Sequence, residues 1–160
     1  NSARRVPAFT CEMTVGAFLD FIADLRGFAA STRRTRLDHV IGRLQLEGVI
    51  AQTMETLSKG FKRRVGLAQA IVHDPRVLIL DEPTDGLDPI QKHEVRTLIS
   101  EIAREKTIVI STHILEEVDA VCTRAVIIAR GRLVADDTPS GLRSRAPSGR
   151  LDDVFRAVAA

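Results

Sequence analysis

Three ionisable side chains follow short apolar runs in this sequence. Asp81 and Glu82 come directly after the apolar residues 77–80, and His113 comes just after a second expected strand, residues 107–111, whose central residues 108–110 are apolar. Short runs that are apolar throughout are typical of strands buried on both faces of a parallel sheet. Because ligands of open α/β sheets bind beyond the carboxyl ends of the strands, we expect these three side chains to meet at one edge of a sheet.

The residue types indicate chemistry on a phosphate group. Asp81 would hold Mg²⁺, largely through water, since this hard cation prefers carboxylate oxygen and keeps several waters. Glu82 would orient or deprotonate an attacking water, and His113 would hydrogen-bond a terminal phosphate or that water. A lone Asp or His at a strand end is often a helix cap or a turn residue, and for His113 alone that interpretation is the more frequent one. Two adjacent carboxylates after a buried strand repel each other unless a cation offsets them, which favours a functional role for the pair.

A second candidate lies earlier in the chain, at Ser58 and Gly60. These residues precede a helical pattern, so the turn could present a hydroxyl and unpaired backbone N–H groups to a phosphate. The alternative is an ordinary helix start with Ser58 as N-cap. The basic residues that follow, Lys62, Arg63 and Arg64, are interpreted together with Lys59 as a solvated face.

The surrounding pattern predicts the elements that must position these residues. Apolar residues at helical spacing predict a helix capped by Thr14 and stopped by Gly27, a second from about Ser31 to Leu44, and a third that starts near Phe61 and ends before Pro75. Further helices are expected after Pro89 and around residues 114–121, with strands at 77–80, 107–111, 125–129 and 133–135, the last two joined through Gly131. Short helices near residues 140–144 and 151–155 close the chain. Alternation of strands and helices predicts an α/β fold with a largely parallel sheet.

Composition excludes several classes of protein. Of 160 residues, 44% are hydrophobic and 28% charged, with 10 Gly and 6 Pro, which is neither disordered nor collagen-like. A formal charge of +2 does not argue for a nucleic-acid partner. Cys11 and Cys122 lack the spacing of a zinc or redox motif, and no apolar run reaches the roughly 18 residues that cross a bilayer.

Taken together, four segments resemble the motifs of the ATP-binding cassette (ABC) transporter ATPases. In that family they are the signature motif, the Walker B strand with its catalytic glutamate, the D-loop and the switch histidine, which correspond here to Leu57-Ser58-Lys59-Gly60-Phe61, Leu78-Ile79-Leu80-Asp81-Glu82-Pro83-Thr84, Gly86-Leu87-Asp88-Pro89 and Ser111-Thr112-His113. Their order and spacing match over essentially the whole chain. Both ends of the chain resemble the exporter-type branch of the family.

The resemblance implies a fold, cofactors and roles. The fold would be the C-terminal portion of a P-loop NTPase-like α/β core with an inserted α-helical subdomain. Residues 1–60 would be an N-terminal remnant and the helical subdomain, residues 61–137 the nucleotide-binding core, and residues 138–160 tail helices. ATP and Mg²⁺ would be the cofactors, with Asp81, Glu82 and His113 serving their own subunit's nucleotide. Ser58, Lys59, Gly60 and Asp88 would serve the nucleotide across a head-to-tail dimer.

The resemblance also implies partners and a location. The chain would pair with itself or with another ATPase subunit and would drive a separate membrane permease, while no nucleic acid is expected. It would lie peripherally on the cytoplasmic face of the inner (plasma) membrane.

The sequence departs from the family pattern in two respects. Lys59 and Phe61 stand where the commonest signature has glycine and glutamine, which affects contacts rather than the role of the motif. No G-x-x-x-x-G-K-[ST] phosphate loop occurs in the 160 residues, and no glutamine loop precedes Met13. We therefore expect a piece of a longer protein that by itself hydrolyses almost no ATP. Two alternatives stay open, namely a non-transport ABC ATPase and a truncated cassette that acts only as a binding or regulatory module.

Overall fold

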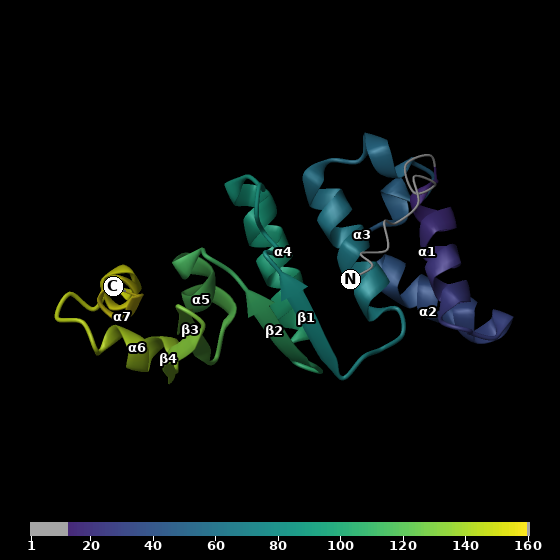
Figure 1. Ribbon diagram of the computed structural model, residues 1–160. Helices are drawn as coiled ribbons and strands as arrows, with labels where there is room; N and C mark the ends of the chain where they lie inside the picture. The colour runs from purple at the N-terminus through teal and green to yellow at the C-terminus, as the bar shows by residue number, and fades with distance from the viewer. Residues whose placement is uncertain (1–12, 160) are drawn as a thin grey trace. The chain divides into compact units, whose positions relative to one another are not determined.

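A computed structural model describes residues 13–159, which form two compact units, one up to Val109 and one from Ile110 onward (Figure 1). Cys11 and the first twelve residues of the expected N-terminal remnant lie outside this range. Within it, no helix is long and apolar enough to cross a membrane. Helices and strands alternate along the chain, and the fold is α/β with a parallel sheet, as the sequence predicts.

The first unit begins with the predicted helices. Helix α1 (Val15–Leu25) starts at Thr14, whose hydroxyl accepts a hydrogen bond from Ala17 N, and ends before Gly27, which has φ +73°. Helix α2 (Ala30–Arg43) follows, then two 3₁₀ turns, η2 (Glu47–Val49) and η3 (Met54–Thr56), and helix α3 (Lys59–Ile71). Helix α1 contacts both α2 and α3, so these three helices form one packed group.

A β–α–β unit follows α3 in the chain. Strand β1 (Val77–Asp81), helix α4 (Pro89–Ile102) and strand β2 (Thr107–Ser111) come in this order, and β1 pairs with β2 (Figure 1). A helical crossover between neighbouring strands is the connection that parallel pairing requires. Helix α4 buries Val95, Leu98, Ile99 and Ile102, the face that the sequence pattern indicates.

Strand β1 differs from the prediction in one respect. The uniformly apolar run predicts burial on both faces, whereas burial alternates along the strand, with Leu78 at 4% and Leu80 at 8% exposure but Ile79 at 75%. A run of apolar residues carries no period-2 signal, so the sequence could not show that only one face is covered here.

The second unit is built on an antiparallel hairpin. Strands β3 (Ala125–Ala129) and β4 (Arg132–Asp137) are joined by Arg130 and Gly131, both at positive φ, as a two-residue hairpin turn requires. One face of the hairpin, with Ala135, packs on helices α6 (Pro139–Arg143) and α7 (Leu151–Ala159) through Leu142 and Leu151. Helix α5 (Leu115–Val121) adds Leu115 and Val118 to this core.

Candidate functional site

Asp81 and Glu82 lie at the carboxyl end of β1. Asp81 is the last residue of the strand and is exposed, while Glu82 is partly buried and adopts φ +45°. Positive φ is uncommon for a residue with a side chain, and such strain often occurs at functional sites. The strand therefore ends at Asp81, and the backbone turns at Glu82.

The two carboxylates at this strand end fit a Mg²⁺ ion whose remaining ligands are waters and phosphate oxygens. No group of three or more His, Cys, Asp or Glu side chains that could hold a metal occurs among residues 13–159. Asp81 is an exposed carboxylate, and Glu82 is the carboxylate next to it in the chain. Mg²⁺ is commonly bound through one or two carboxylates together with waters and substrate phosphates, so the arrangement suits this cation.

The loop from β1 to α4 is anchored at both of its ends. Asp85 N donates to Glu82 O at 3.2 Å, and Thr84 is buried, with 1% exposure. Asp88 is the N-cap of α4, where its Oδ1 accepts a hydrogen bond from Gln91 N at 2.9 Å. The predicted D-loop residue Asp88 therefore has a structural role that its own helix explains.

Ser58 likewise caps a helix. Its Oγ accepts a hydrogen bond from Phe61 N at 3.3 Å, which is the structural alternative considered for this residue. Lys59 is exposed, and Gly60 is buried in the first turn of α3. A Cβ atom at Gly60 would lie 3.1 Å from the side chain of Gln91, so glycine allows the start of α3 to approach the start of α4 closely.

The structure brings the α3 start and the β1–α4 loop together. Arg63 Nη2 donates to the carbonyl oxygen of Asp85 at 3.3 Å. Lys59 Nζ lies 3.6 Å from where a Cβ atom of Gly86 would be, and Gly86 has φ +70°. Two sequence motifs separated by more than twenty residues thus form one contiguous surface within the first unit.

His113 belongs to the second unit, where it follows β2 and is exposed. The preceding hydroxyl, Thr112 Oγ1, accepts a hydrogen bond from Ile114 N at 3.0 Å and so shapes the turn that carries the histidine. The expected meeting of His113 with Asp81 and Glu82 stays a prediction.

The interpretation of Arg64 as part of a solvated face is wrong. Arg64 is buried, with 8% exposure, and its guanidinium donates to Gln45 Oε1 at 3.0 Å and to Glu94 Oε2 at 2.7 Å. It also lies over the ring of Phe61, 5.5 Å from the ring centroid. Helical spacing carried the signal that was missed, because position 64 is three residues after the inward position 61 and four residues before the inward position 68.

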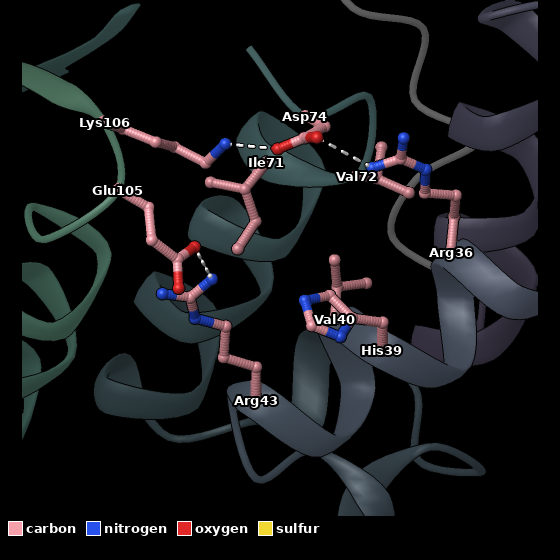
Figure 2. Close-up of a pocket in the computed structure, with 9 residues that line it drawn as sticks. All are labelled: Arg36, His39, Val40, Arg43, Ile71, Val72, Asp74, Glu105 and Lys106. Atoms are coloured by element: carbon pink, nitrogen blue, oxygen red, sulfur yellow. Dashed lines mark hydrogen bonds and ion pairs between the residues drawn. The ribbon is translucent and has the colours of Figure 1, made fainter. Parts of the chain in front are cut away.

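A cluster of charged residues lines a cavity of about 160 Å³ between α2, the end of α3 and the turn before β2 (Figure 2). Asp74 pairs with Arg36 at 3.2 Å and with Lys106, and Arg43 pairs with Glu105 at 2.9 Å. Hydrogen bonds from Lys106 and Arg36 hold the pKa of Asp74 below its usual range, and a hydrogen bond from Arg43 lowers the pKa of Glu105. Each carboxylate is thus already engaged by cations, and the cluster ties α2 to the rest of the unit.

Comparison with known proteins agrees with the resemblance. The sequence profile of the family described as ABC transporter matches residues 4–85. An uncharacterized ABC transporter ATP-binding protein of Bacillus subtilis is 37% identical over 122 residues, which are 73% of this chain and 40% of that protein. The Nod factor export ATP-binding protein I of Paraburkholderia xenovorans is 42% identical over 117 residues, 72% of this chain and 38% of that protein. The chain therefore spans about two fifths of the length of these curated relatives.

Solved structures give the same result for the fold. The cbiO1 subunit from Clostridium perfringens, described as part of an ABC transporter complex, superposes with a TM-score of 0.77 at 30% identity, over 91% of this chain and 61% of that one. An ATP-binding subunit of an ABC transporter gives a TM-score of 0.75 at 28% identity, over 94% and 64% of the two chains. With the profile matching more than half of its residues, the chain belongs to the ABC transporter family of ATP-binding proteins.

Proposed function

We propose that this chain is part of the ATP-hydrolysing subunit of an ABC exporter, in which closure of two ATPase subunits on ATP drives a separate membrane permease. The observation that carries the proposal is the carboxylate pair Asp81–Glu82, placed at the end of β1 beside a loop that the signature helix α3 contacts. The exporter direction is supported by the similarity to a Nod factor export protein.

Each site residue has one role in this proposal. Glu82 accepts a proton from, or orients, the water that attacks the terminal phosphate. Asp81 holds Mg²⁺ largely through water, and the cation, when bound, neutralises charge on the phosphates. His113 hydrogen-bonds the terminal phosphate or the attacking water.

The signature residues serve the nucleotide of the partner subunit. Ser58, Lys59 and Gly60 stand at the N-terminus of α3, where unpaired N–H groups and the helix dipole favour an anion. Asp88 lies at the neighbouring α4 start and would face the dimer interface. The helical subdomain within residues 1–60 would receive the permease, residues 61–137 would form the nucleotide-binding core and residues 138–160 its tail. The subunit would act peripherally at the cytoplasmic face of the membrane.

The test begins with the gene. Sequencing upstream of Asn1 and through the neighbouring genes should show a phosphate loop, a glutamine loop and a multi-span membrane protein. The full-length subunit should then hydrolyse ATP in a Mg²⁺-dependent manner. An in-frame start at or just before Asn1, or a full-length protein that binds ATP without turnover, would contradict the proposal and favour a binding or regulatory module.

A further inference from the structure

Arg63 holds the loop that carries Glu82. Its guanidinium, on the second turn of α3, reaches across to the carbonyl oxygen of Asp85 at 3.3 Å. Asp85 N in turn donates to Glu82 O at 3.2 Å, so the loop residue that Arg63 holds is itself bonded to Glu82. One side chain of the signature helix is thereby connected to the backbone of the candidate base.

The loop needs such a restraint. Glu82 has φ +45°, a conformation that a residue with a Cβ atom keeps only when its surroundings fix it. Burial of Thr84 and Leu87, with 1% and 7% exposure, anchors the loop from the inside. Asp85 lies between these two residues and is itself exposed, so burial does not fix it. The hydrogen bond from Arg63 to its carbonyl oxygen supplies the restraint instead.

We propose that Arg63 is a positioning residue for Glu82, acting through the carbonyl of Asp85, and that it links the turn formed by Ser58 and Gly60 to the catalytic loop of the same subunit. This inference rests on the proposed ATPase function. Because Arg63 bonds to a backbone carbonyl of the loop and is not one of the residues assigned to the nucleotide, its removal should slow the chemical step and leave nucleotide affinity largely unchanged.

The test compares three variants of the full-length subunit in ATP hydrolysis at saturating Mg²⁺. Arg63→Met removes the donors and keeps most of the side-chain length, and Arg63→Lys keeps a donor on a side chain of similar length. Lys62→Met is the matched control, since Lys62 precedes Arg63 in α3 and donates to the carbonyl of Glu55, away from the catalytic loop. Loss of one hydrogen bond predicts a fall in kcat of about threefold to tenfold for Arg63→Met, with KM within about twofold of wild type.

Arg63→Lys should keep at least half of the kcat that Arg63→Met loses, and Lys62→Met should match wild type. An unchanged kcat in Arg63→Met, or an equal fall in Arg63→Met and Arg63→Lys, overturns the positioning role. The positioning role is also overturned if Arg63→Met and Lys62→Met both lower kcat and the thermal unfolding midpoint, because the cause is then a loss of helix stability. Absence of hydrolysis in the wild-type protein instead overturns the proposed function, and this inference with it.

Discussion

Arg64 Nη2 lies 2.7 Å from Glu94 Oε2, which joins helix α3 to helix α4 from a buried position. The same guanidinium donates to Gln45, a residue at φ +54° in the segment after α2. Arg64 therefore connects three parts of the first unit: the signature helix, the helix after the D-loop and the end of the helical group. Its planar fork allows one side chain to reach two acceptors at once.

Replacing Arg64 with methionine should destabilise the protein by about 1–3 kcal/mol, because two hydrogen bonds from a charged group are lost and Glu94 loses its partner. Arg64→Lys should recover only part of this loss, since an ammonium on a flexible stem does not reproduce the fork. Urea unfolding of the full-length protein measures both changes. Equal stability of Arg64→Met and wild type would contradict the structural role assigned to Arg64.

The ion pairs of Asp74 and Glu105 should make stability depend on acid pH. Both carboxyls have a pKa below the ordinary value in the folded protein, so their contribution is fully present above the unfolded pKa of about 4 and is lost as pH falls through the folded pKa. The double variant Asp74→Asn, Glu105→Gln should therefore show a shallower loss of stability below about pH 4 than wild type. Thermal unfolding midpoints at a series of pH values test this. Because both carboxyls are exposed, high salt should reduce the difference, and an identical pH slope in the two proteins would exclude these pairs as its source.

Glu82→Gln should abolish turnover while ATP binding persists. The amide keeps the shape of the side chain but accepts no proton, so the loss of kcat should be about 100-fold or more. Equilibrium ATP binding and steady-state hydrolysis by the full-length subunit measure the two properties separately. Hydrolysis close to the wild-type rate would refute the role of Glu82, and loss of binding would indicate damage to the fold instead.

Ser58→Arg should prevent closure of two subunits on ATP without unfolding either. A long cation at the exposed α3 start would occupy the space of the partner's nucleotide, and loss of the N-cap should cost about 1 kcal/mol of stability. Ser58→Thr, which keeps a capping hydroxyl, is the matched control. Size-exclusion chromatography with ATP in the Glu82→Gln background should show dimer for the control and monomer for Ser58→Arg. A dimer in both would show that this turn does not face the second subunit.

Thr84→Val should leave the protein as stable as wild type or stabilise it by up to about 1 kcal/mol. Thr84 is buried, and among the described residues its hydroxyl oxygen has no hydrogen-bond partner. Valine keeps the shape and removes a polar group whose burial is unfavourable. Thr84→Ser, which keeps the hydroxyl and loses the methyl group, should destabilise by about 1 kcal/mol. Chemical denaturation compares the two, and the opposite order would show that the hydroxyl is satisfied in solution.

Local signals in the sequence determined most elements of the fold. Thr14 and Gly27 mark the two ends of α1, Pro89 marks the start of α4, and Gly131 marks the β3–β4 turn, as predicted. Each of these depends on backbone geometry or capping within a few residues, which is why sequence alone was sufficient. The motif order likewise identified the family, since it depends on residue types and spacing only.

Contacts between distant segments were decided by the tertiary structure alone. Sequence reasoning placed Arg64 on a solvated face, and it had no means of pairing Arg63 with Asp85 or of fitting Gly60 against Gln91, because these contacts depend on how α3 and α4 pack. The one-sided burial of β1 was hidden for a related reason, since a uniformly apolar run gives no indication of which face is covered. Residue types and spacing thus specified the chemistry of the chain, whereas the packing of its helices determined which side chains hold that chemistry in place.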